Sequence, residues 1–117
     1  MPEALRDMKY GERDEERIDF LPAVSAEGKM ALPPTLLWIH GGAWQIPAPK
    51  EVNAWVACSL RVAGVNVALL EYSSHSPNNL PISIQCQQAI AATRWLAAKF
   101  ESGELCGDPN RFIIGGL

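Results

Sequence analysis

A histidine and two glycines directly follow a short apolar run of the chain. The run "LLWI" occupies residues 36–39, and His40, Gly41 and Gly42 come next. Glycine permits a positive φ and lets the backbone come within hydrogen-bond distance of a ligand. Backbone N–H groups held in this way stabilise a developing negative oxygen, and one such donor is worth roughly a hundred- to a thousand-fold in rate. The spacing therefore predicts an oxyanion-binding turn, with a plain strand-to-helix turn as the alternative.

The alternation of apolar runs and helical periods predicts the elements that position this turn. Apolar runs on both faces suit parallel strands that helices cover above and below. The predicted fold class is α/β, a mostly parallel sheet with right-handed crossovers and helices on both faces. Ligands of such sheets bind beyond the carboxyl ends of the strands, where Gly41-Gly42 and Gly115-Gly116 both fall. The expected strands are 17–21, 35–39, 65–72 and 112–117, and the expected helices run from 50 to 63 and from 82 to about 103.

Helical spacing also predicts which side chains face the sheet. The expected inward face of the first helix consists of Val52, Trp55, Val56, Ser59, Leu60 and Ala63. The expected inward face of the second consists of Ile82, Cys86, Ala89, Ile90, Thr93, Leu96, Ala97 and Phe100. Cys58 and Cys86 are therefore interpreted as packing residues, and Trp38, Trp55 and Trp95 as core residues.

Length and composition exclude several classes of function. The 117 residues, 48% apolar and 20% charged, indicate one globular domain, with residues 1–16 as a polar lead-in and 17–117 as the sheet and helices. A net charge of −3 without a basic run argues against nucleic acid, and no apolar run is long enough for a membrane span. The N-terminus lacks a secretory h-region, and three widely spaced cysteines favour a reduced, cytoplasmic protein without a metal site.

The segment "LLWIHGGAW" resembles the oxyanion segment of α/β-hydrolase esterases, notably the hormone-sensitive-lipase-like carboxylesterases and the kynurenine formamidases. "ERIDFLPA", "VNVALLEY" and "AIAATRWLAAKFESGELCGDPNRFIIGGL" are similar to further parts of that fold, in the family order. The resemblance covers residues 11–117. It implies the N-terminal portion of an α/β-hydrolase, cut just before the nucleophile elbow.

The resemblance also implies roles for individual residues. The N–H groups of Gly42 and Ala43 would form the oxyanion hole, and Gly41 and His40 would support the loop. Trp44 would pack beside the acyl pocket and bind substrate. Gly116 and Leu117 would start the G-x-S-x-G elbow, so that the next residue would be the nucleophilic serine.

The catalytic triad is not expected within these residues. The family order is Ser, then Asp or Glu, then His, whereas His40 and His75 both precede the elbow. The chain alone is therefore predicted to be inactive. The expected parent is a serine hydrolase that cleaves a small-molecule carboxylic ester or aryl formamide without a cofactor.

Two departures from the family pattern leave the subfamily open. Ser73 follows Tyr72 where the family commonly has Tyr-Arg, and "QCQQA", residues 85–89, replaces a helix segment that is usually acidic. A non-catalytic hydrolase-fold protein that binds a small ligand is the alternative, and a nucleotide-binding α/β domain is a weaker one. His75 is interpreted as an exposed loop residue, and Glu71 as a surface or ion-paired residue.

Overall fold

The computed structural model describes residues 3–24, 32–39, 55–73 and 81–116, with Val56 described by its backbone alone. Its elements are β1 (Leu5–Lys9), β2 (Arg17–Leu21), β3 (Thr35–Ile39), α1 (Trp55–Val62), β4 (Asn66–Leu70), α3 (Ile82–Ser102) and β5 (Phe112–Gly116).

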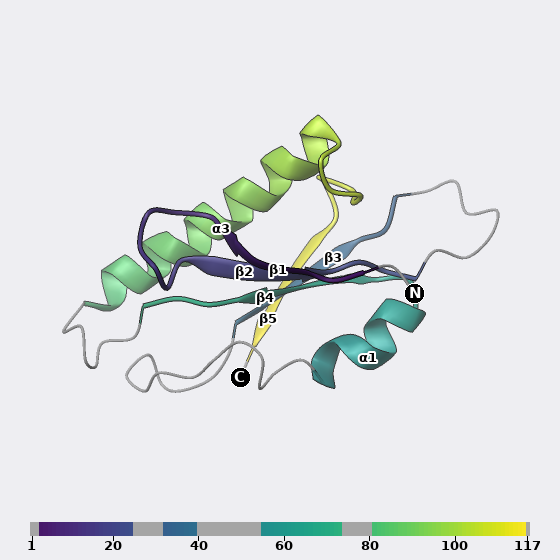
Figure 1. Ribbon diagram of the computed structural model, residues 1–117, viewed down its shortest axis with the longest axis horizontal. Coiled ribbons are helices and arrows are strands. Elements are labelled where there is room, and N and C mark those ends of the chain that lie inside the picture. The colour runs from purple at the N-terminus through teal and green to yellow at the C-terminus, as the bar shows by residue number, and fades with distance from the viewer. Residues whose placement is uncertain (1–2, 25–31, 40–54, 74–80, 117) are drawn as a thin grey trace.

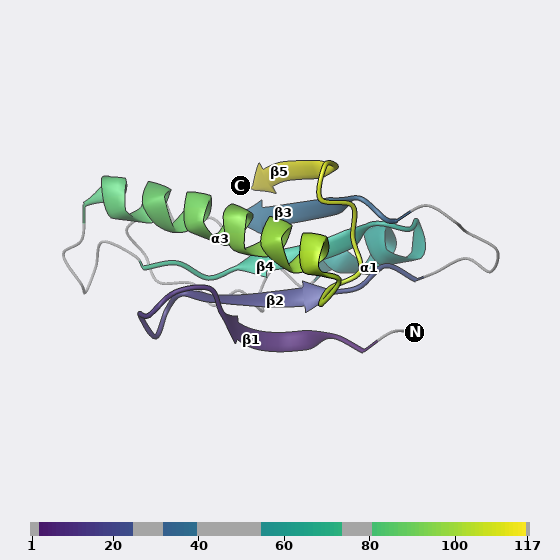
Figure 2. The ribbon, with the colours of Figure 1, turned by 90° about the horizontal axis from the view of Figure 1, so that it is seen from above.

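The five strands form one mixed sheet in the order β1-β2-β4-β3-β5. The strands β3, β4 and β5 are parallel, as expected, whereas β2 pairs antiparallel with both β1 and β4. Figure 2 shows this order across the sheet, with β1 and β5 at opposite edges. The expectation of a mostly parallel sheet is therefore correct for β3, β4 and β5, whereas β2 runs antiparallel to both of its neighbours.

The strand β1 lies in the segment that was expected to be a polar lead-in. Its sequence LRDMK is mostly charged and mostly exposed, so it lacks the apolar signal of a buried strand. Its pairing with β2 is interrupted by a bulge between Leu5 and Met8, and Asp7 has a φ of 55°. Bulges and charged side chains are typical of edge strands.

The two helices cover opposite faces of the sheet, as predicted (Figure 1). On one face, α3 contributes Leu96 and Phe100 to a core with Phe20 and Leu37. On the other face, α1 contributes Ala57, which packs with side chains that alternate along the same strands, Leu21, Val67 and Leu69. Each central strand is thus apolar on both sides because both sides are covered.

The helix α1 buries a different face from the one predicted. Its buried residues are Ala57 and Arg61, with Leu60 half-buried, whereas Ser59 and Ala63 are exposed. Burial of an arginine is possible here because its Nε donates a hydrogen bond to the carbonyl oxygen of Pro22, at 2.7 Å.

The helix α3 buries the predicted Leu96 and Phe100, but its first turns bury other residues than those predicted. Its buried residues are Gln85, Gln88, Ala92, Leu96 and Phe100. Ile82, Cys86 and Ile90, which were predicted to face the sheet, are exposed. Gln85 and Gln88 were not among the residues predicted to face inward, and their burial is possible because both amides have hydrogen-bond partners inside.

Three further packing predictions are corrected. Cys58, Cys86 and Cys106 are all exposed. The Trp55 side chain is 65% exposed, although its ring meets that of Trp38 edge-on at a centroid distance of 6.4 Å. Trp38 and Trp95 are half-buried and pack against the two cores, as expected.

The buried side chain of Asn66 links the amino ends of β3 and β4 to two neighbouring segments by hydrogen bonds. The Asn66 amide accepts a hydrogen bond from the N–H of Ala23 and donates to the carbonyl of Cys106, both at 2.8 Å. It also donates to the Thr35 hydroxyl at 3.2 Å. These bonds fix the start of β4 against its neighbours, so the register at the opposite, carboxyl end follows.

Glycines end both helices, as predicted. Gly64 has a φ of 92°, and Gly103 has a φ of 81° with its N–H bonded to the carbonyl of Phe100. Among the described residues, no helix has the length and apolar character needed to cross a membrane.

Candidate functional site

The carboxyl ends of β3, β4 and β5 lie side by side at one end of the sheet. Ile39, the last residue of β3, pairs with Leu70, the last residue of β4, and with Gly116, the last residue of β5. His40 and Leu117 are the next residues along the chain from two of these partners. The His-Gly-Gly segment and the predicted elbow therefore begin next to each other in the sheet, at the carboxyl end of the strands, where α/β sheets bind ligands.

At the carboxyl ends of the two strands, β5 comes so close to β3 that a glycine is required. A Cβ atom at Gly116 would collide with the backbone carbonyl oxygen of Ile39. At Gly115, in contrast, the nearest atom to such a Cβ is the Leu36 Cδ1 at 3.4 Å, which is an ordinary contact. Of the two glycines, Gly116 is the one that the packing demands, and it is also the predicted first glycine of the elbow.

The segment that leaves β4 at this edge is held by two glutamine side chains. The N–H of Ser73 donates to Gln88 Oε1 at 2.8 Å, and Gln88 Nε2 donates to the Ser73 hydroxyl at 2.9 Å. Gln85 Nε2 donates to the Ser73 carbonyl oxygen at 2.8 Å. All three residues are buried. We call this set the Ser73 clamp; it joins the end of β4 to the first turns of α3.

The Ser73 clamp brings together the two departures from the family pattern. Ser73 stands where the resembled family commonly has arginine, and Gln88 stands in the helix segment that is usually acidic. In this chain the two positions form a neutral contact. The two positions that depart from the resembled pattern are therefore in direct contact, and neither of them carries a charge. The sequence showed two departures from the family pattern, but the contact between these two positions was not predicted.

A buried tyrosine holds the same end of β4 from the other side. The Tyr10 hydroxyl donates to the carbonyl oxygen of Glu71 at 2.7 Å, and the N–H of Glu71 donates to the carbonyl of Arg17 at 2.9 Å. Burial raises the pKa of Tyr10 above its ordinary value, and the nearby carboxylates of Glu16 and Glu71 raise it further. Burial also raises the pKa of Tyr72. Both phenols are therefore neutral hydrogen-bonding and packing groups at ordinary pH.

Most of the predicted site residues lie outside the described part of the chain. These residues are His40, Gly41, Gly42, Ala43, Trp44 and Leu117. His75, which was interpreted as an exposed loop residue, also lies outside the described part. Gly116 is described, at the expected carboxyl end of a parallel strand. Within the described ranges, no three His, Cys, Asp and Glu side chains are grouped so that they could hold a metal ion.

Several solved structures with a similar arrangement are esterases. A truncated form of a carbohydrate esterase from gut microbiota superposes with a TM-score of 0.80 at 21% identity, over 99% of this chain and 39% of its own. The α/β-hydrolase-like fold follows from this match. The esterase Est2 of Thermogutta terrifontis gives a TM-score of 0.77 at 21% identity, over 98% of this chain and 41% of its own. Esterase B of Lactobacillus rhamnosis gives 0.76 at 22%, over 97% and 35%.

The sequence comparisons agree with this fold. A carboxylic ester hydrolase of Bombus ignitus is 30% identical over 94 residues, which are 77% of this chain and 17% of that protein. No family model matches the chain. The α/β-hydrolase-like chain thus spans less than half of each of the esterases that it resembles.

Proposed function

We propose that this chain is the N-terminal part of a serine hydrolase that cleaves a small-molecule carboxylic ester or an aryl formamide by acyl transfer. The observation that carries the proposal is the pairing of Ile39 with Gly116. Because of this pairing, the His-Gly-Gly segment and the residue that follows Leu117 start from adjacent strand ends. An oxyanion hole and a nucleophile need this proximity, since both act on the same carbonyl group.

In the proposed mechanism, a serine that directly follows Leu117 attacks the carbonyl carbon. The N–H groups of Gly42 and Ala43 stabilise the negative oxygen of the tetrahedral intermediate. The alcohol or amine then leaves with the proton that the serine hydroxyl gave up, and water hydrolyses the acyl-enzyme to release the acid and restore the serine. Gly41 permits the turn, His40 orients it, and Trp44 lies beside the acyl group. The chain alone is inactive in this proposal, because the acid and the base follow the nucleophile in this fold. The resemblance to esterases of known structure supports the choice of substrate class.

The first test is the reading frame that encodes the chain. Ser-x-Gly directly after Leu117, followed by an Asp or Glu and then a His, supports the proposal. A residue other than Ser or Cys at the first position contradicts it and favours the alternative, a hydrolase-fold protein that binds a small ligand without cleaving it.

The second test removes one oxyanion donor. Ala43→Pro in the protein that includes the serine deletes the N–H of residue 43, and kcat on p-nitrophenyl butyrate is expected to fall by about a hundred-fold or more. Ala43→Gly keeps the N–H and serves as the matched control, with kcat close to that of the unaltered protein. Full activity of Ala43→Pro would show that the hole is assigned to the wrong amides.

A further inference from the structure

Residues 71–73, which follow β4 at the carboxyl end of the sheet, are held by side chains from two distant parts of the chain. Tyr10, from the turn between β1 and β2, lies 61 positions before the residue that it holds. Gln88, from the first turns of α3, lies 15 positions after the residue that it holds. Tyr72, in the middle, is buried in the core that α3 covers. We call residues 71–73 the β4 exit.

On the side of the β1–β2 turn, both backbone polar groups of Glu71 are bonded. Its carbonyl oxygen accepts from the Tyr10 hydroxyl at 2.7 Å, and its N–H donates to the carbonyl oxygen of Arg17 at 2.9 Å. The turn fixes Tyr10 as well, because the N–H of Tyr10 donates to the carbonyl oxygen of Glu16 at 3.0 Å. Tyr10 is buried, so water competes little for its hydrogen bonds.

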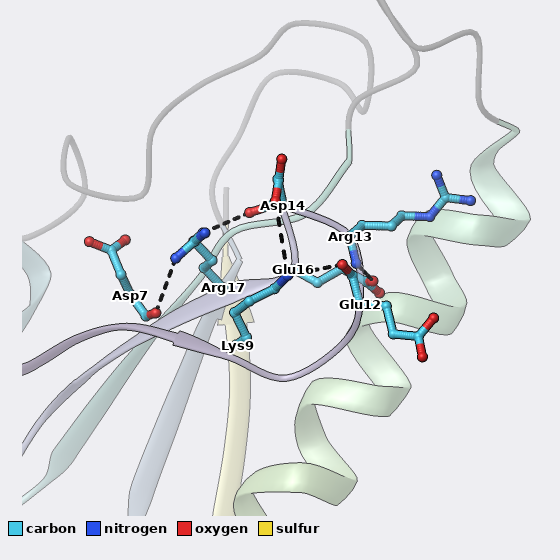
Figure 3. A network of polar contacts seen from close by, with 7 residues as sticks. All are labelled: Asp7, Lys9, Glu12, Arg13, Asp14, Glu16 and Arg17. Carbon is cyan, nitrogen blue, oxygen red and sulfur yellow. Dashed lines mark hydrogen bonds and ion pairs between the residues drawn. The ribbon is translucent and has the colours of Figure 1, made fainter.

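Charged side chains hold the turn on both sides of Tyr10, as Figure 3 shows. Lys9 donates to the carbonyl oxygen of Glu12 at 2.9 Å, and Arg17 donates to that of Asp14 at 2.8 Å. Exposed charged groups contribute little stability individually. Both of these bonds end on backbone groups of the turn, however, so they define the course of the main chain from which Tyr10 reaches the β4 exit.

On the side of α3, the Ser73 clamp bonds every polar group of Ser73. Gln88 accepts from its N–H and donates to its hydroxyl, and Gln85 donates to its carbonyl oxygen. Each of these three residues is at most 3% exposed. A buried amide is tolerated only where it is hydrogen-bonded, so the burial of both glutamines depends on Ser73 staying in place.

The β4 exit begins beside the strand that leads into the proposed oxyanion segment. Leu70, directly before the exit, pairs with Ile39, and His40 follows Ile39 in the chain. A shift of the end of β4 would therefore be passed to the end of β3 through this pairing. Catalytic groups have to be held within about 0.5 Å of the productive geometry, and a misplacement of about 1 Å can lower the rate about a hundred-fold.

We propose that Tyr10 and Gln88 are positioning residues for the proposed acyl transfer and that they act through the β4 exit. This inference rests on the proposed function. Tyr10 holds the exit at Glu71 and Gln88 holds it at Ser73, so that the end of β4 stays aligned with the end of β3. Their loss misplaces the oxyanion donors, which act in the transition state, and leaves the contacts that bind the substrate. A positioning role therefore lowers kcat and changes KM little, whereas a merely structural role lowers stability alone.

The test measures kcat and KM on p-nitrophenyl butyrate in the protein that includes the serine, at a temperature at which every variant is folded. Tyr10→Phe and Gln88→Leu are each expected to lower kcat about ten-fold and to change KM by less than about two-fold. If Gln88→Leu does not fold, Gln88→Asn, whose amide is too short to reach Ser73, replaces it with the same expectation. In the double variant neither anchor remains, so its loss in kcat is expected to exceed the product of the single losses.

Thr35→Val is the matched control. It also removes one buried side-chain hydrogen bond, which the Thr35 hydroxyl accepts from the Asn66 amide at 3.2 Å, but at the opposite, amino end of the same strands. Its kcat is expected to stay within about two-fold of that of the unaltered protein.

Three results overturn the positioning role and leave the proposed function in place. They are unchanged kcat in both single variants, an equal fall of kcat in Thr35→Val, and a loss that appears in KM alone. A fall in only one of the two single variants removes the other residue from the proposal. If the unaltered protein does not hydrolyse the ester, the proposed function is contradicted, and the positioning role with it.

Discussion

Gly116 has a role both in the packing of the sheet and in the proposed nucleophile elbow. A methyl group there would collide with the carbonyl oxygen of Ile39, so β3 and β5 would have to separate at the candidate site. We expect Gly116→Ala to lower the free energy of unfolding by about 1–3 kcal/mol, as overpacking of a core typically does. Gly115→Ala is the control, since a Cβ there makes an ordinary contact with Leu36.

The measurement is urea unfolding followed by tryptophan fluorescence, at submicromolar concentration so that self-association is weak. Equal losses of stability for the two alanine variants would mean that the close approach at Gly116 does not constrain the strand end.

Tyr10 provides a second prediction, through its hydroxyl and its burial. Tyr10→Phe removes the hydrogen bond to the Glu71 carbonyl and is expected to cost about 1 kcal/mol at pH 7. Burial raises the pKa of Tyr10 in the folded state above its unfolded value of about 10. Its neutral form therefore stabilises the fold fully below pH 10. This stability is lost above pH 10, where the unfolded state releases the proton first.

The free energy of unfolding of the unaltered chain is therefore expected to fall as pH rises above about 10. It should fall less steeply in Tyr10→Phe, which retains only the contribution of Tyr72, whose pKa burial also raises. Urea titrations between pH 8 and 11 measure both slopes. Identical slopes in the two proteins would contradict the assignment of Tyr10 as a buried neutral phenol.

At the scale of single elements, the sequence predicted where the helices end better than which way they face. Gly64 and Gly103 ended the helices where expected because a positive φ is a local property of the residue. The buried faces depend on partners that lie far away in the sequence. Arg61 and Gln88 turn inward because Pro22 and Ser73 offer hydrogen-bonding groups there. Helical periodicity alone does not show such partners, so these polar residues were not among those predicted to face inward.

The Ser73 clamp gives a prediction at this scale. Gln88→Leu removes the acceptor for the Ser73 N–H and the donor to its hydroxyl, both of which are buried. We expect Gln88→Leu to lower the free energy of unfolding by about 1–3 kcal/mol, the usual cost of a buried polar group left without a hydrogen-bond partner. The neighbouring Gln87 is exposed, so Gln87→Leu should change it by less than about 0.5 kcal/mol.

Hydrogen exchange of the Ser73 amide reports on the clamp itself. It should become faster in Gln88→Leu and stay unchanged in Gln87→Leu. If both leucine variants protected this amide as well as the unaltered chain does, then the main-chain pairing of β4 rather than the glutamine would be holding the segment.

At the scale of the whole molecule, the sequence predicted the central parallel strands and the helices on both faces, but not the full topology. Arg17–Leu21 and Thr35–Ile39 matched their predicted bounds because each is a short, mostly apolar run that ends at a proline or at a histidine and two glycines. The strand β1 was not predicted, because its residues are mostly charged and exposed, as is usual for an edge strand, and give no apolar pattern. Of the predicted site, Gly116 is described at the expected edge; the assignments of His40, Gly41, Gly42, Ala43, Trp44 and Leu117 stay predictions.

The last prediction concerns the stability of the chain by itself. The described residues leave eight large apolar side chains exposed, two of them on the unguarded strand β5. Because exposed apolar groups at an open strand edge promote association of partly unfolded chains, we expect thermal unfolding to be irreversible and to shift with protein concentration. Ile113→Lys combined with Ile114→Lys should reduce aggregation more than Val62→Lys, which removes an even more exposed apolar residue on α1. Light scattering during calorimetry measures this, and reversible, cooperative unfolding of a soluble monomer would contradict it.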